Sequence, residues 1–276
     1  VRSADRLSGL TEAGEWWQDS VVIQTKRPTG QAEWYGDSSN IPYANYDHNY
    51  ESRSIVNFEL GFKVGRLEEA REAASGINMA VEKRASAALG LDIRRNRHAF
   101  FGYVGNGSRS FGLLNDPGLP AYTSAASTYA AMTYEQLTAE ISTQLNLIAT
   151  QSGGNVDHLS NYVIALPLGY YSVLTKPNTM GKTVMEWLNE NYPNVRIEMV
   201  PEFLSANGGA NVAYYWAESV NDGSTDGGSA MTQVVPAKLF NIGSEQRSKE
   251  YIEDFGSATA GVIVKRPYLF VRRTGV

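Results

Sequence analysis

The sequence predicts an α+β fold, and three kinds of local pattern support this prediction. Residues 67–89 repeat apolar side chains at intervals of three and four, which is the spacing of an amphipathic helix. Capping boxes indicate two shorter helices, since Thr133 is followed by Gln136 and Thr183 by Glu186. Runs rich in β-branched and aromatic residues, bounded by glycine and proline, predict strands.

The composition is that of a globular protein and excludes several classes of site. The chain has 276 residues, of which 42% are hydrophobic and 19% charged, enough for one large domain or two modest ones. Because cysteine is absent, disulfides and thiolate metal sites are excluded. The net charge of -5 gives no indication of the basic face that nucleic-acid readers carry. No apolar run approaches the ~20 residues of a membrane-spanning helix, so no membrane partner is predicted.

The N-terminal quarter of the chain is predicted to need a neighbour. Residues 1–20 are polar and lack a clean period, so we expect an arm that another surface covers, with a helix over residues 10–17 as the alternative. Strands are predicted over residues 21–25 and 54–63, with residues 26–30 breaking the first. The whole of 21–63 would then be a long two-stranded excursion. Such a pair is marginal alone in water and would have to lie on a neighbour.

The longest helix is predicted over residues 67–89, which at 1.5 Å per residue gives a length of roughly 35 Å. Gly76 is a weak point within it, and Gly90 is the expected C-terminal stop. We expect its narrow, alanine-rich stripe to pack closely on a sheet. The stripe consists of Leu67, Ala70, Ala73, Ala74, Ile77, Val81, Ala85 and Ala88.

Two capped helices follow a turn-rich stretch at residues 96–119. The first begins at Thr133 and ends at the glycine pair 153–154, and the second begins at Thr183 and ends before Pro193. The apolar stripe of the first consists of Leu137, Ile141, Leu145 and Ile148. Further strands are predicted over residues 195–200, 234–242 and 261–272.

Two glycine-containing motifs match parts of nucleotide-binding loops but lack essential residues. The sequence GKT at 181–183 ends like a phosphate-binding loop, yet Lys176 stands where the first glycine belongs. The sequence GNG at 105–107 begins like a dinucleotide-binding fingerprint, yet Ser110 stands where the third glycine belongs. We therefore predict a helix cap at Thr183 and a tight turn at 105–107.

The polar loop at residues 221–229 matches the opening of a calcium-binding loop. Asp222, Ser224, Asp226 and Gly227 have suitable spacing, but Gln233 replaces the bidentate glutamate that the site needs. A flexible, solvated hairpin tip is expected, with weak calcium binding as the alternative.

The remaining polar residues give no catalytic constellation. His48, His98 and His158 are far apart and have no ligand-spaced partners, so surface or structural roles are expected. No catalytic residue, metal site or cofactor is predicted, and the chain is not expected to be an enzyme. Two basic clusters could face phosphate, although salt bridges between subunits or solvation are favoured. They are Arg94, Arg95, Arg97 and His98, and Lys265, Arg266, Arg272 and Arg273.

A set of short segments, in a fixed order, carries a family resemblance. Residues 161–204 have the pattern strand, turn, short helix, strand. The other matching segments are RLEEA at 66–70, AFFG at 99–102, FGLLNDP at 111–117, VIALP at 163–167, VPE at 200–202 and GVIVKRP at 261–267. Together they resemble the major capsid proteins of tailed bacteriophages, which have the Hong Kong 97-type shell fold. The resemblance covers nearly the whole chain from about residue 21.

The resemblance implies a domain plan and a function. Residues 1–20 would be the N-terminal arm and residues 21–63 the extended loop. Residues 64–115 and 231–276 would form the peripheral domain around a spine helix, and residues 116–230 the axial domain. The chain would self-assemble, as hexamers and pentamers, into an icosahedral head that encloses double-stranded DNA without sequence-specific binding. It would be a virion component assembled in the bacterial host cytoplasm, with portal, scaffold and decoration proteins as further partners.

Aromatic and basic residues are the candidate contact sites in such a shell. Tyr and Trp suit interfaces, where one end of the ring is buried and the other is wet. The candidate inter-subunit contacts are Trp16, Trp17, Trp34, Tyr35, Tyr43 and Tyr46, and the candidate lumen or interface basic residues are Arg94, Arg95 and Arg97. Lys26 lies in the expected loop, but without an evident activating carboxylate no crosslink is predicted.

Two alternative functions stay open at the level of the sequence. One is a bacterial nanocompartment shell, which shares the fold and would be recognised by an enclosed cargo enzyme. The other is a calcium-binding or hydrolytic protein that uses the loop at residues 222–233.

Overall fold

The computed structural model describes residues 3–38, 40–75, 79–105, 107–224 and 226–276, which fall into two compact units. The first unit contains Val1–Val21, Ser52–Asp116 and Thr232–Ile263, and the second contains Val22–Glu51, Pro117–Met231 and Val264–Val276. Each unit therefore collects segments that are far apart in the sequence. Residues 264–276 join the second unit, although the resemblance groups them with residues 231–263.

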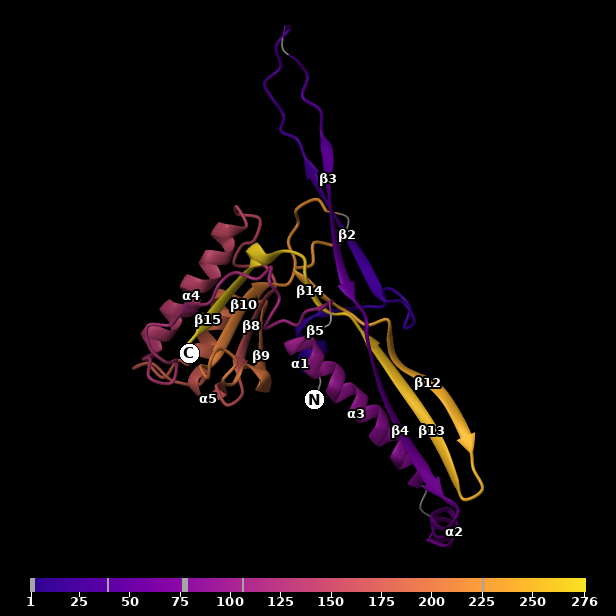
Figure 1. Ribbon diagram of the computed structural model, residues 1–276. Coiled ribbons are helices and arrows are strands. Elements are labelled where there is room, and N and C mark those ends of the chain that lie inside the picture. Colours follow the sequence, from indigo (N-terminus) through magenta and orange to yellow (C-terminus); the bar gives the residue numbers. More distant parts are fainter. Residues whose placement is uncertain (1–2, 39, 76–78, 106, 225) are drawn as a thin grey trace. The chain divides into compact units, whose positions relative to one another are not determined.

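In the first unit, an antiparallel sheet carries the longest helix along one face (Figure 1). In pairing order the strands are β12 (Ala237–Gln246), β13 (Glu250–Thr259) and β4 (Val56–Gly65), and the helix is α3 (Met79–Phe101). Ala87 and Leu91 of α3 pack against Phe255 of β13. Phe58 and Phe62 of β4 complete this small core, so the helix and the sheet stabilise each other.

The helix predicted over residues 67–89 is in fact two helices, α2 (Arg66–Ser75) and α3, and the second continues past the expected stop at Gly90. Gly90 lies inside α3, where an added Cβ would be 2.6 Å from Cδ2 of Leu60. The glycine therefore permits close approach of strand β4 instead of ending the helix. Gly76, the predicted weak point, lies outside the described residues, as does Ile77 of the predicted stripe.

The predicted contact stripe of this helix is also wrong. Leu67 and Val81 are 66% and 56% exposed, and the buried side chains of α3 begin only at Ala87. At 100° per residue, Ala87 and Leu91 lie about 100° around the helix from the line through Val81, Ala85 and Ala88. The sheet therefore covers a different side of α3 from the predicted one, and Val81 and Ala85 of the predicted stripe remain exposed.

The N-terminal segment packs on its own chain, which corrects the expectation that it has no cover of its own. Helix α1 (Ser3–Leu7) buries Ala4 and Leu7, and its Asp5 forms an ion pair with Arg95 of α3 at 2.9 Å. The backbone N–H of Ala4 also donates to the side-chain oxygen of Asn96 at 2.9 Å. These contacts fix residues 3–7 against the C-terminal half of α3.

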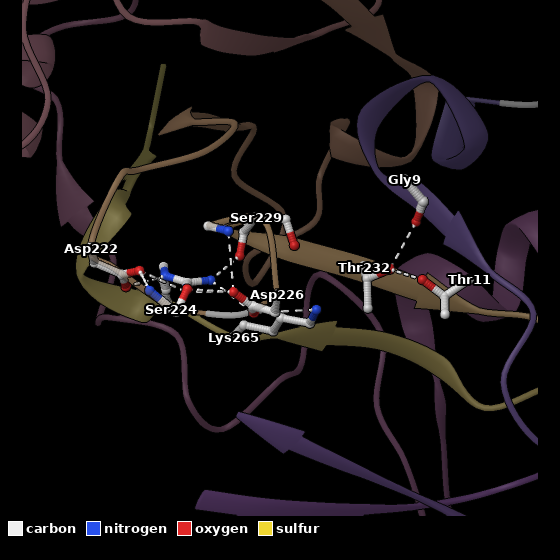
Figure 2. Close-up of polar contacts among 10 residues, drawn as sticks. Gly9, Thr11, Asp222, Ser224, Asp226, Ser229, Thr232 and Lys265 are labelled. Atoms are coloured by element: carbon white, nitrogen blue, oxygen red, sulfur yellow. Dashed lines mark hydrogen bonds and ion pairs between the residues drawn. The ribbon is translucent and has the colours of Figure 1, made fainter. Parts of the chain in front are cut away.

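A strand follows α1, and residues 10–17, all of them described, do not form the alternative helix. Strand β1 (Gly9–Thr11) pairs in parallel with β11 (Met231–Val234), whose other neighbour is β14 (Gly261–Val264). The hydroxyl groups of Thr11 and Thr232 are hydrogen-bonded at 2.7 Å (Figure 2). Residues 9–11 are thus held by strand pairing with residues 232–234. The sequence of residues 1–20 does not indicate this distant partner.

The turn-rich stretch begins later than predicted, because residues 96–101 complete α3. It contains β5 (Tyr103–Gly105) and β6 (Ser108–Ser110), which pair as a short antiparallel hairpin. Gly107, between them, has a positive φ of 79°, as the predicted tight turn requires. Asn106 itself lies outside the described residues.

The second unit is built on a five-stranded sheet whose two central strands are buried at every position. In pairing order the strands are β7 (Thr123–Ser124), β15 (Phe270–Thr274), β10 (Val212–Ala217), β8 (Tyr162–Pro167) and β9 (Val195–Val200). Helix α4 (Tyr134–Gln151) contacts β10 and β15. Tyr214 and Tyr215 of β10 face opposite sides, where their hydroxyl groups bond those of Tyr122 and Tyr129. Both faces of the sheet are therefore covered.

Both predicted capping boxes are confirmed. Thr133 accepts from the backbone N–H of Gln136 at the start of α4, and the side chain of Gln136 accepts from Thr133 in return. Thr183 and Glu186 do the same at the start of α6 (Val184–Asn191). The predicted stripe of α4 is buried, and Val195–Val200 forms a strand as expected. The remaining short elements are α5 (Tyr171–Leu174) and the 3-10 turns Pro201–Phe203 and Pro267–Leu269.

The long excursion has a different pairing from the predicted one. Strand β2 (Ser20–Thr29) continues through the expected break and pairs with β3 (Asn45–Ser54), while β4 pairs with β13 instead (Figure 1). Residues 45–53, which lie outside the predicted strands, therefore form one side of a two-stranded ribbon. Residues 30–44 connect the two strands without regular structure at the described positions.

Replacing Gly261 with alanine should destabilise the first unit strongly. Its φ is 82°, and an added Cβ would overlap the carbonyl oxygen of Phe111. Gly153 is a matched control, because its φ is 67° and nothing lies within 4 Å of an added Cβ. Backbone strain of about 1–2 kcal/mol applies to both, and the overlap adds about 1–3 kcal/mol at Gly261 alone. Urea unfolding of Gly261→Ala and Gly153→Ala measures the difference, and equal midpoints would contradict this packing.

Candidate assembly surfaces and the Arg266 cluster

The connection between β2 and β3, residues 30–44, holds the most exposed aromatic side chains of the described residues. Trp34, Tyr35 and Tyr43 are 97%, 93% and 89% exposed, and Ile41 is 76% exposed. Tyr46, at the start of β3, is half-exposed. An apolar surface of this kind, gathered in one loop and rimmed by polar residues, is typical of a protein-protein contact. We call residues 30–44 the aromatic loop.

Trp16 and Trp17 lie in the first unit, where they differ in their contacts. The ring of Trp16 stacks on Phe240 of β12 with centroids 4.8 Å apart, and Asn57 of β4 donates to the carbonyl oxygen of Trp16 at 3.0 Å. Trp17 is 65% exposed. Trp16 therefore belongs to the surface of its own subunit, and one side of its ring remains open beside a groove of about 400 Å³.

The three basic candidates on α3 are not equivalent. Arg95 is buried and forms ion pairs with Asp5 and Asp92 of its own chain, which corrects its assignment as a lumen or interface residue. Arg94 and Arg97 are exposed, and neither has a carboxylate partner among the residues that the structure describes. Their guanidinium groups lie over the rings of Phe58 and Phe101, at 5.3 Å and 5.9 Å from the centroids.

An apolar ridge accompanies Arg94 and Arg97 on the outer side of α3. Leu89 and Ile93 are each 48% exposed, and Phe101 is 45% exposed. Their spacing of four and eight residues places them in one row with Arg97 on the helix surface. We call the row of Leu89, Ile93, Arg97 and Phe101, with the adjacent Arg94, the α3 ridge.

The loop that resembled a calcium site is occupied by an arginine. The guanidinium group of Arg266 is fully buried and donates to Asp222 at 2.8 and 3.2 Å and to Asp226 at 2.7 and 3.1 Å. It also donates to the hydroxyl group of Ser224 and, at 2.6 Å, to the carbonyl oxygen of Ser229. Figure 2 shows Asp222, Ser224 and Asp226 converging on one point from the same loop.

This arrangement corrects two expectations for the loop. Its carboxylates already hold a cation, so the calcium-binding alternative loses its ligands. The tip is also fixed to the segment after β14, since Lys265 adds an ion pair with Asp226 at 3.4 Å. The sequence could have suggested the partner only by pairing the two acidic residues with a basic cluster some forty positions away.

Opposing effects set the acidity of these carboxyl groups. Burial alone would raise the pKa of Asp222, but the hydrogen bonds and charge of Arg266, together with Ser224, lower it to about 2. The same opposition between burial and Arg266 holds the pKa of Asp226 far below its ordinary value. Both groups are therefore ionised at neutral pH and bind the arginine as carboxylates.

The other members of the second basic cluster also have partners within the chain. Arg273 forms an ion pair with Glu140 of α4 at 2.6 Å. Arg272 lies 4.1 Å from the ring centroid of Tyr122 and donates to the carbonyl oxygen of Pro120 at 2.5 Å. The contacts of this cluster within the chain therefore stabilise the second unit.

No group of three acidic, histidine or cysteine side chains among the described residues could hold a metal ion. His98 is buried, shares a 2.7 Å hydrogen bond with Ser110, and has its pKa lowered to about 4 by burial and by the charge of Arg94. His48 bonds Gln24 at 3.0 Å, and His158 is exposed. No described helix is long and apolar enough to cross a bilayer.

A family model described as Pa193 gp26 major capsid protein matches residues 1–275. The chain belongs to this family of major capsid proteins. The role of a major capsid protein is structural, as the shell's main subunit. No curated protein matches the sequence.

Solved structures show the fold of this capsid protein. The capsid of Myoviridae phage XM1 has a TM-score of 0.74 at 17% identity, over 98% of this chain and 90% of that one. The capsid of an empty GTA particle has a TM-score of 0.64 at 9% identity, over 99% and 89%. A virus-like particle from Pyrococcus furiosus has a TM-score of 0.52 at 14% identity, over 98% and 94%. The predicted α+β, Hong Kong 97-like fold is confirmed.

Replacing Arg266 with methionine should cost the capsid protein about 3–5 kcal/mol of unfolding free energy, because two carboxylates lose their cation. The pH dependence should also change. In the native chain the two lowered pKa values stabilise the fold above about pH 4, and this contribution is lost as the pH falls through about 2. In the variant, lowering the pH from 4 to 2 should reduce the free energy of unfolding by a smaller amount than in the native chain.

Denaturant unfolding at pH 7, 4 and 2 measures both effects. Arg247→Met is the control, since Arg247 pairs with Glu245 and Glu250 at the surface and its loss should change the unfolding midpoint little. Equal losses for the two variants would contradict the role assigned to Arg266.

Proposed function

We propose that this capsid protein assembles, as hexamers and pentamers, into the icosahedral head of a tailed bacteriophage that encloses double-stranded DNA. The observation that carries the proposal is the aromatic loop. Trp34 and Tyr35 are almost fully exposed, so a single copy leaves much apolar surface in water. Burial of that surface on neighbouring copies would drive assembly and supply stability without disulfides.

The α3 ridge of a neighbouring copy is the surface that suits the aromatic loop. The loop carries Glu33 and Asp37, which have no cationic partner among the described residues, whereas the ridge carries Arg94 and Arg97. Both surfaces are also apolar, so contact would bury rings against Leu89 and Ile93 while the opposite charges pair at the rim. Arginine over aromatic rings adds a further attraction.

The charge distribution suits a shell that encloses DNA without gripping it. The chain has a net charge of -5, and Arg95, Arg266 and Arg273 are held by carboxylates of the same subunit. A net negative chain with these cations already paired is not expected to show strong, salt-dependent DNA binding as a single subunit. In the proposed shell, the DNA would be held inside by the closed wall and not by affinity for each subunit.

The domain roles follow from the proposed assembly. Residues 1–20 would act as the N-terminal arm and 21–63 as the extended loop, with a peripheral domain of 64–115 and 231–276 and an axial domain of 116–230. Trp17, Tyr43 and Tyr46 would lie at contacts between subunits. Portal, scaffold and decoration proteins would be the further partners, and assembly would take place in the host cytoplasm.

Replacing Trp34 and Tyr35 together with serine should abolish shell formation while leaving the subunit folded. Neither ring packs on its own chain, so the unfolding midpoint should change little, whereas assembly loses its largest apolar contacts. Negative-stain electron microscopy measures the yield of closed shells, and thermal unfolding measures the stability of the subunit. Shells of normal yield from the folded variant would contradict the proposal.

A charge exchange tests where the aromatic loop binds. Glu33→Arg with Asp37→Arg, or Arg94→Glu with Arg97→Glu, should each reduce the yield of shells about tenfold or more, because like charges then meet. The four changes combined should restore assembly. If the combined variant assembles no better than either pair, the loop does not bind the α3 ridge.

A further inference from the structure

We propose that a groove on the first unit binds a basic, amphipathic segment of a second protein. The groove is about 400 Å³ in volume and lies beside β12 and β4, on the sheet that carries α3. We call it the Trp16 groove. It is lined by Trp16, Asn57, Phe58, Glu59, Phe240, Asn241 and Ile242.

The apolar part of the groove is held in place before any partner arrives. Phe240 stacks on Trp16 with an interplanar angle of 26°, and the Asn57 side chain fixes the backbone of Trp16. Beneath Phe240 lies Gly256 of β13, where an added Cβ would overlap the phenyl ring. The ring can therefore lie flat on the sheet, and a bound side chain would meet a preformed aromatic wall.

The backbone beside the groove can accept an extended segment. Strand β12 is an edge strand of its sheet, since β13 is its single partner among the described strands. Ile242 of β12 is 52% exposed at the groove. An edge strand next to an apolar pocket is the arrangement used for strand addition, in which backbone bonds give affinity and the pocket selects a side chain.

The charges around the groove select a basic partner. Glu59 of β4 and Asp254 of β13 are exposed, and neither has a cationic partner in the described part of the chain. They share one face of the sheet, because Asp254 packs over Gly61, two residues from Glu59. Two carboxylates beside an apolar groove repel nucleic acid and attract lysine or arginine.

The same charges argue against a second copy of the aromatic loop as the occupant. That loop carries Glu33 and Asp37, so like charges would meet at the groove. The occupant with the right chemistry is therefore a segment of another protein that alternates apolar and basic side chains. This inference goes beyond the proposed assembly, and it concerns a surface that the aromatic loop does not use.

Peptide binding to the full chain in unassembled form tests the inference. The probes are two fluorescent peptides, one alternating leucine with lysine and one alternating leucine with glutamate. The lysine peptide should bind more tightly. The double variant Glu59→Lys with Asp254→Lys should bind the lysine peptide about tenfold more weakly and the glutamate peptide more tightly. Ile242→Ser should weaken the binding of both peptides.

Glu135→Lys is the control for a charge reversal away from the groove, because Glu135 is an exposed acidic residue of α4 in the other unit. It should change the affinity for the lysine peptide less than twofold. Equal losses in Glu135→Lys and the double variant would show attraction to net charge alone and overturn the proposal, as would unchanged binding in the double variant. Shell formation is scored separately by electron microscopy, so this inference and the proposed function can fail independently.

Discussion

The ladder between β4 and β13 is the interaction on which the first unit depends. It joins residues 56–65 to residues 250–259 along the full length of both strands. Because Phe58, Phe62 and Phe255 all lie on one face, the ladder also creates the apolar surface that holds α3. Helix α3 in turn provides Arg95 and Asn96, which fix the N-terminal helix. Loss of that pairing would leave α3 and α1 without their support.

Buried arginines hold the chain in place at positions where strand pairing ends. Arg53 and Asp116 form a buried ion pair at 2.8 Å in the first unit, and Arg266 holds its loop in the second. Such groups are costly to bury and become strongly destabilising when one partner is removed. Their main effect is therefore to hold each loop in one conformation, and their contribution to the net free energy of unfolding is smaller. A shell subunit needs that fixed geometry, because its contacts repeat many times by symmetry.

The surfaces left over by this internal packing differ in chemistry. The aromatic loop is apolar and acidic, the α3 ridge is apolar and basic, and the Trp16 groove is aromatic with an acidic rim. In the proposed assembly, like charges would keep the loop away from the groove and opposite charges would attract it to the ridge. One chain can therefore present one surface for its own copies and another for a different protein, with charge as the discriminator.

Features that depend on neighbouring residues could be predicted from the sequence alone. The capping boxes at Thr133 and Thr183, the stripe of α4 and the ordered segments of the capsid fold were all predictable, because caps and periodicity act within a few residues. Long-range packing settles which side of α3 is buried, which strand pairs with β2, and which cation is bound by the Asp222 loop. Those outcomes depend on segments up to two hundred residues away, and an apolar or acidic residue carries no mark of the partner that will reach it.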